Sequence, residues 1–127
     1  MKALVADDVP MIRKLVEFHL KHLGFEISNA ADGAEALDVA ARTKFDLIML
    51  DIMMPEIDGL EVLRRLRADS VNKETPVIIM TAYGDSSNVR RAMEYGASDF
   101  IVKPVEQSSF RTKVIKAVSA KPNGIPK

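Results

Sequence analysis

The stretch that most restricts the fold is the apolar run 47–50, which ends at an acid, Asp51. Four consecutive apolar residues without alternation indicate a strand covered on both faces, as at the centre of a parallel sheet. Pro55 follows and excludes continued pairing as a central strand. Open α/β sheets bind their ligands at the carboxyl ends of the strands, so Asp51 is a candidate functional carboxylate. A lone Asp before a loop more often only begins a turn, and the rest of the chain has to decide between the two.

Strand and helix patterns alternate along the whole chain. Short apolar runs predict strands at 3–6, 47–51, 77–81 and 99–102, and an alternating stretch predicts one at 25–29. Helical periodicity follows each of them. Five such pairs predict a three-layer, doubly wound (βα)5 parallel sheet of the flavodoxin-like class. The alternating second strand suits an edge position, which gives the strand order 2-1-3-4-5.

Capping residues mark where several of these helices begin and end. Asp32 and Glu35 have the spacing of a capping box, and Asp58 and Glu61 repeat it. Gly24 is the expected end of the first helix. The last helix is expected to bury the face formed by Phe110, Val114, Ile115 and Val118.

Composition limits the class of protein. A chain of 127 residues is the size of one domain, expected over residues 1–120 with a turn-rich tail at 121–127 that is a flexible end or the start of a linker. Cysteine is absent, and 18 basic residues balance 18 acidic ones. This balance argues against a domain-wide nucleic-acid surface, and no apolar stretch is long enough to span a membrane. We expect a cytoplasmic protein with no direct nucleic-acid or membrane partner.

Reactive side chains stand at the ends of four of the predicted strands. Asp7 and Asp8 follow the first, Asp51 ends the third, Thr81 ends the fourth and Lys103 follows the fifth. These four strands are neighbours in the predicted order, so their ends should converge. Two carboxylates ~4 Å apart repel by on the order of 4 kcal/mol at an effective dielectric of ~20, which calls for a cation. Oxygen ligands of this kind suit Mg²⁺. Each residue alone has an ordinary explanation as a cap or turn, but together they are hard to assign to chance.

Such a pocket suits phosphoryl transfer. An aspartate can attack a phosphoryl group to form an acyl phosphate, while a cation and an ammonium neutralise the charge that is transferred. Three rival sites fit less well. A haloacid-dehalogenase-type phosphatase needs a second acid where Met53 stands, an EF-hand excludes Pro55, and a nucleotide-binding fold needs a glycine-rich first loop. His19 and His22 lie in the first helix, away from the acids, and are expected to be ordinary surface or boundary residues.

The chain resembles response-regulator receiver domains, such as the chemotaxis response regulator, over nearly all of its length. The matching motifs are Asp7-Asp8, Asp51 to Pro55, Asp58-Gly59, Thr81-Ala82 and Lys103-Pro104. The resemblance implies that Asp51 accepts the phosphoryl group. It also implies that Mg²⁺ is held by Asp7, Asp8, Asp51 and the backbone carbonyl of Met53.

Further roles follow from the same resemblance. Thr81 and Lys103 are expected to contact the phosphoryl group, Phe100 stands at the position of an aromatic switch, and the Lys103–Pro104 bond is expected to be cis. Met53 and Tyr83 each stand two residues beyond a site residue and are expected to flank the water that hydrolyses the acyl phosphate. Both are bulky and neither is a good base, so slow hydrolysis is expected.

The function implied is that of a phosphorylation-controlled switch in a two-component system or phosphorelay. The donor would be a sensor histidine kinase or a histidine phosphotransfer protein, and the chain would catalyse only its own phosphorylation and dephosphorylation. A downstream target, or a second copy in a homodimer, would bind the face of the fourth helix, fifth strand and fifth helix. The residues expected to be exposed there are Arg90, Arg91, Glu94, Arg111 and Lys113. The alternative is a pseudo-receiver that docks partners without being phosphorylated.

Overall fold

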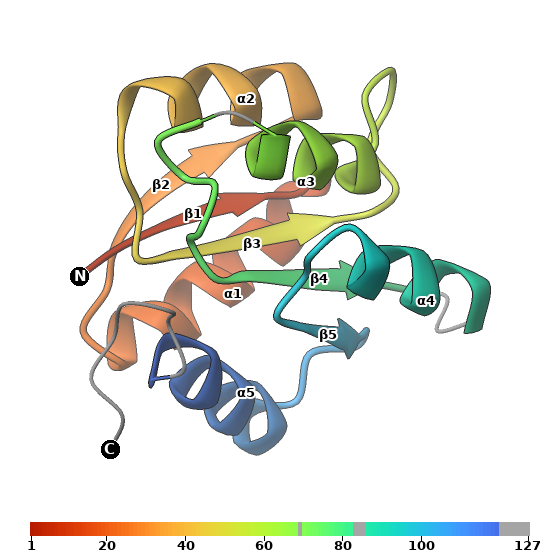
Figure 1. Ribbon diagram of the computed structural model, residues 1–127. Helices are drawn as coiled ribbons and strands as arrows, with labels where there is room; N and C mark the ends of the chain where they lie inside the picture. The colour runs from red at the N-terminus through yellow and green to blue at the C-terminus, as the bar shows by residue number, and fades with distance from the viewer. Residues whose placement is uncertain (69, 83–85, 120–127) are drawn as a thin grey trace.

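Five short strands form a single parallel sheet. The computed structural model describes residues 1–68, 70–82 and 86–119. The strands are β1 (Lys2–Ala6), β2 (Glu26–Ala30), β3 (Leu47–Asp51), β4 (Val77–Thr81) and β5 (Asp99–Val102). The helices are α1 (Pro10–His22), α2 (Gly33–Arg42), α3 (Gly59–Ala68), α4 (Ser86–Glu94) and α5 (Gln107–Ser119). The strand order is β2-β1-β3-β4-β5, all parallel, which confirms the predicted topology (Figure 1).

The sheet separates two hydrophobic cores. Successive side chains of a strand point to opposite faces, so Ile48 and Leu50 enter one core while Leu47 and Met49 enter the other. Helices α2, α3 and α4 cover the first core, and α1 and α5 cover the second (Figure 1). All five residues of β3 are buried, as the unbroken apolar run predicts, whereas Glu26 and Asn29 of the edge strand β2 are exposed. No helix of the described ranges has both the length and the apolarity to cross a membrane.

The predicted caps are present. The backbone N–H of Glu35 donates to Asp32 Oδ1 at 2.8 Å, and Glu35 Oε1 accepts from the N–H of Ala31 at 2.8 Å, which closes the first turn of α2. Asp58 Oδ1 accepts from the N–H of Glu61 at 2.9 Å at the start of α3. These bonds satisfy backbone donors that a helix start leaves unpaired, and they fix where the helices begin.

Two predictions for the helices are wrong in detail. Ile115 is 47% exposed, and the buried residues of α5 are Phe110, Val114 and Ala117. The buried positions follow the spacing of four and three residues that defines one helical face, and Ile115 lies off that face. Helix α4 begins at Ser86, inside the predicted loop 82–87.

A buried asparagine links two connections that the sequence suggests are solvated. The side chain of Asn72 is fully buried in the predicted polar loop 68–75. Its Nδ2 donates to the carbonyl oxygens of Ala40 (2.7 Å) and Thr43 (2.8 Å). Its Oδ1 accepts from the N–H of Phe45 (2.8 Å) and from Thr75 Oγ1 (2.9 Å). The α3–β4 connection is thereby bonded to the end of α2 and to the segment before β3.

We expect the Asn72→Ala variant to lose about 3–5 kcal/mol of unfolding free energy, because each buried polar group left without a partner costs about 1–3 kcal/mol. Urea denaturation followed by circular dichroism measures the loss. Asn29→Ala, at an exposed position of β2, is the matched control and should change stability by less than about 0.5 kcal/mol. Equal stabilities of the two variants would contradict the role given to Asn72.

Candidate functional site

The residues predicted to form the site stand at one edge of the sheet. Asp7 directly follows β1, Asp51 ends β3, Thr81 ends β4, and Lys103 directly follows β5. These strands are consecutive in the sheet, and the carboxyl ends of all of them lie on the same side (Figure 1). The parallel register pairs Asp51 with Met80, directly before Thr81. The predicted convergence is therefore a consequence of strand order and strand length.

Three carboxylates meet at this edge. Ligand oxygens of Asp7, Asp8 and Asp51 all lie within 4.8 Å of one another. Asp7 and Asp51 are buried, with 0% and 3% of their surface exposed, and Asp8 is exposed. The cluster therefore has a buried base and a side that is open to solvent through Asp8. A group of carboxylate oxygens at this spacing is a suitable donor set for Mg²⁺.

The ammonium group of Lys103 joins the two buried carboxylates. Its Nζ lies 2.9 Å from Asp7 Oδ2 and 3.2 Å from Asp51 Oδ1. The backbone holds it in place, because the N–H of Lys103 donates to the carbonyl oxygen of Thr81 at 2.7 Å. The bond from Lys103 to Pro104 is cis. The cis bond agrees with the expectation from the sequence. Asp7 is fixed further by the N–H of Val9, which donates to its Oδ1 at 2.9 Å.

The protonation of the pocket reflects its burial. Burial raises the pKa of Asp51 and the negative charge of Asp7 raises it further, while Lys103 and the backbone N–H of Met53 oppose this rise without cancelling it. For Lys103, burial alone lowers the pKa, but the hydrogen bond to Asp7 and the charge of Asp51 outweigh it, so the pKa is raised overall. The ammonium therefore stays charged at neutral pH. The raised pKa of Asp51 shows that its ionised form lacks full compensation by the protein.

The loop between β3 and α3 completes the site. The backbone N–H of Met53 is close enough to the Asp51 carboxylate to lower its pKa, and the Met53 side chain is 58% exposed. The N–H of Gly59 donates to the carbonyl oxygen of Ile52 at 2.9 Å, and a Cβ at Gly59 would overlap the carbonyl oxygen of Asp51. Glycine at 59 is thus required by the close approach of two backbone segments. Tyr83 lies outside the described residues, so the water-flanking role of Met53 and Tyr83 stays a prediction, which the phosphoryl decay rate of Met53→Asn would test.

Phe100 is held by a lysine of α5. The ring is half-buried and packs against the core beneath α3 and α4. Lys113 Nζ lies 5.0 Å from the ring centroid, donates to the carbonyl oxygen of Phe100 at 3.0 Å, and lies 3.3 Å from Asp99 Oδ1. Lys113 is half-buried, so its expected exposure is wrong. Arg90, Arg91 and Glu94 of α4 are exposed, as expected. Arg111 is exposed too, but it lies beside His19 and His22 of α1, so its expected place on this face is wrong.

Comparison with known proteins identifies the family to which this chain is similar. The family described as response regulator receiver domain matches residues 3–115. The transcriptional regulatory protein SrrA of Staphylococcus aureus is 42% identical over 101 residues, which are 80% of this chain and 41% of that protein. The chain therefore spans less than half of the length of this relative.

Solved structures show the same fold. The chemotaxis protein CheY4 of Vibrio cholerae has a TM-score of 0.85 at 32% identity, with 91% of this chain and 97% of that chain covered. The receiver domain of a Pseudomonas aeruginosa sensor histidine kinase, with a magnesium ion coordinated in its active-site cleft, has a TM-score of 0.85 at 25% identity, with 94% and 98% covered. With its acidic pocket at the edge of a 2-1-3-4-5 sheet, the chain belongs to the response regulator receiver domains, the signalling switches of two-component systems that histidine kinases phosphorylate on an aspartate.

Proposed function

We propose that Asp51 is the aspartate that accepts the phosphoryl group. The observation that carries this assignment is the position of its carboxylate, buried at the end of the central strand and 3.2 Å from the ammonium of Lys103. One carboxylate oxygen would form a bond to phosphorus as the bond between phosphorus and the donor's leaving atom breaks. The donor would be a sensor histidine kinase or a histidine phosphotransfer protein.

The surrounding groups would stabilise the transferred charge. Lys103 already contacts Asp51 and needs no large movement to reach a phosphoryl oxygen on it. The hydroxyl of Thr81, at the end of the neighbouring strand, would donate a hydrogen bond to another oxygen. These roles require groups of fixed position, and burial of Thr81 and most of Lys103 supplies that rigidity.

The metal would be Mg²⁺, held by Asp7, Asp8, Asp51 and the backbone carbonyl of Met53. Three carboxylates within 4.8 Å supply the hard oxygen donors that this ion prefers, and the magnesium reported for the Pseudomonas receiver domain supports the choice. When bound, Mg²⁺ neutralises charge on the carboxylates and on the transferred group. Exposure of Asp8 leaves a side for the ion to enter.

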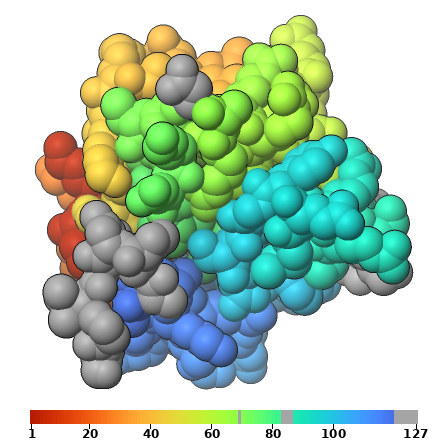
Figure 2. All heavy atoms as spheres, viewed as in Figure 1, coloured from red at the N-terminus to blue at the C-terminus, as the bar shows by residue number. Residues whose placement is uncertain are grey.

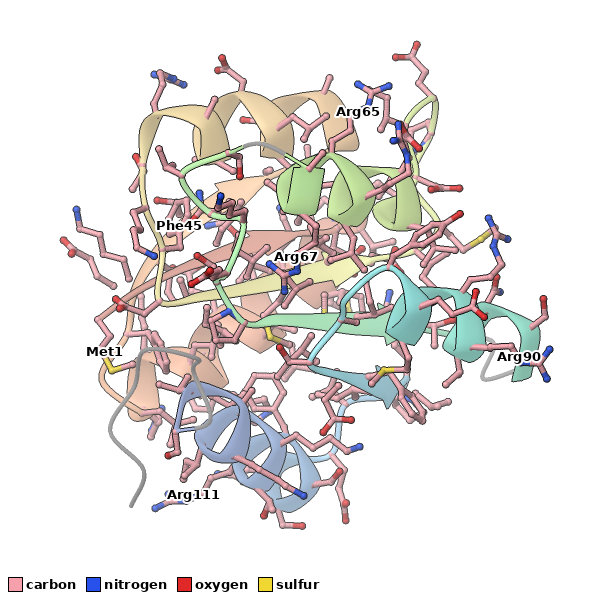
Figure 3. The ribbon with its side chains drawn as sticks, in the orientation of Figure 1. Met1, Phe45, Arg65, Arg67, Arg90 and Arg111 are labelled. Atoms are coloured by element: carbon pink, nitrogen blue, oxygen red, sulfur yellow. The ribbon has the colours of Figure 1, made fainter. Side chains whose placement is uncertain are left out.

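The output surface would be the face formed by α4, β5 and α5. Both helices reach the surface (Figure 2), and Arg90 of α4 points away from the molecule (Figure 3). Arg111 lies apart from this face, on the side of α5 next to His19 and His22 of α1. A phosphoryl group brings about two negative charges and three acceptor oxygens to the end of β4. Movement of Thr81 towards it would leave space into which Phe100 could turn, and a target protein or a second copy of the domain would bind the changed face.

The domain itself would comprise residues 1–120.

Intact mass spectrometry tests the acceptor. After incubation with Mg²⁺ and a small acyl phosphate donor, the wild type should gain one phosphoryl group that is lost in base. Asp51→Asn keeps the shape of the side chain without the nucleophilic carboxylate and should gain none. Asp38→Asn, on the exposed side of α2, is the matched control and should label like the wild type. Equal labelling of Asp51→Asn would show that another residue accepts the group, and an unlabelled wild type would favour the pseudo-receiver.

The switch has a separate test. Phe100→Ala should label like the wild type while losing most of the phosphate-driven gain in self-association or target binding. Analytical ultracentrifugation with and without a phosphate mimic measures the gain in self-association. Phe18→Ala, an exposed aromatic of α1, is the control and should keep the gain. An undiminished gain in Phe100→Ala would make Phe100 a core residue without a switching role.

A further inference from the structure

The first residue of α2 packs against the loop that carries Met53. Gly33 is buried, and a Cβ at this position would overlap the carbonyl oxygen of Ile57, in the loop 52–58 between β3 and α3. The same Cβ would lie 3.0 Å from the Ile57 Cβ and 3.1 Å from its carbonyl carbon. The backbone of α2 is therefore in direct contact with the backbone of the loop 52–58. Any side chain larger than hydrogen at position 33 forces one of these two segments to move.

Helix α2 is the firmer of the two segments. Its first turn is closed by the reciprocal bonds of Asp32 and Glu35, and Ala36 and Ala40 anchor it with no exposed surface in the core. A shift of α2 away from the loop would strain the cap and lift these alanines out of a close-packed interior.

The loop 52–58 is the less firmly held segment, although Ile52 and Met54 within it are buried. Met53, Pro55 and Glu56 are exposed, and Glu56 has a φ of 68°, which is unusual for a residue with a side chain. The ends of the loop are fixed, since the N–H of Ile52 donates to the carbonyl oxygen of Met80 at 3.1 Å and Gly59 is bonded back to Ile52. A displacement of Ile57 would thus be taken up between these ends, in the segment that carries Met53 past the Asp51 carboxylate.

We infer that Gly33 is a positioning residue for the phosphorylation site. It stands on α2, whereas the acidic residues of the site follow β1 and β3, and none of its described contacts is with an acid. Its missing side chain lets the loop 52–58 lie where the Met53 N–H meets the Asp51 carboxylate. The inference rests on the proposed function, because it takes the Met53 segment to be part of the metal and phosphoryl site. A displacement of roughly 1 Å in such a site can reduce a reaction rate by about 100-fold.

The test compares Gly33→Ala with Gly24→Ala. Gly24 has a φ of +92° with open space around it, so its alanine variant is strained but meets no neighbour, and it lies at the opposite end of the strands. We expect Gly33→Ala to bind Mg²⁺ about 10-fold more weakly, by chemical-shift titration of backbone amides, and to label about 10- to 100-fold more slowly. Gly24→Ala should be less stable than the wild type with Mg²⁺ affinity unchanged. Wild-type Mg²⁺ affinity and labelling in folded Gly33→Ala would overturn the role.

A second variant approaches the same contact from the loop. Ile57→Ala removes the half-buried side chain beside Gly33 and leaves the helix intact, so it remains informative if Gly33→Ala does not fold. A loss of Mg²⁺ affinity of about 3-fold, or about 0.65 kcal/mol, is expected. Unchanged Mg²⁺ affinity and labelling in Ile57→Ala would contradict the positioning role. A wild type that neither binds Mg²⁺ nor labels would instead overturn the proposed function, and this role with it.

Discussion

The functional site is organised around two buried carboxylates that share one ammonium group. Asp7 and Asp51 both contact Lys103 Nζ, and Asp8 adds a third carboxylate within 4.8 Å. The acids outnumber the ammonium that they share. Burial raises the pKa of Asp51, and the negative charge of Asp7 raises it further. The pocket is therefore arranged to receive a cation, and with it the charge of a phosphoryl group.

The fold maintains this arrangement because the strands that carry the site residues are buried between two layers of helices. A parallel sheet covered on both faces places the carboxyl ends of four neighbouring strands at one edge. The buried apolar side chains fix the register of these strands, because a shift by one residue would exchange the two faces. Glycines then allow backbone segments to approach one another around the loop 52–58, at Gly59 against Asp51 and at Gly33 against Ile57. The site is thus supported by contacts among segments far apart in the chain.

The amino-acid sequence predicts the strands and the residues of the pocket, because both follow from short local patterns. The apolar runs give the strands, and the acid, hydroxyl and ammonium groups at their ends give the pocket. Asn72 bonds to Phe45, 27 residues away, and Gly33 meets Ile57 on another segment. Lys113, expected to be exposed, bonds to the carbonyl oxygen of Phe100 on β5. A single polar or small residue carries no signal in the sequence of such a partner. Ile115 was misplaced because neighbouring apolar residues on a short helix do not by themselves show which of them faces the core.

Equilibrium unfolding in EDTA and in increasing Mg²⁺ tests most directly whether the pocket lacks a cation. Because the folded pocket should bind the ion and the unfolded chain should not, the urea midpoint of the wild type should rise with Mg²⁺. The gain in stability should be about 1.4 kcal/mol at ten times the dissociation constant. Asp8→Ala, which leaves the buried pair with Lys103 intact, should lose most of this gain. An identical midpoint for the wild type in EDTA and in Mg²⁺ would contradict the account.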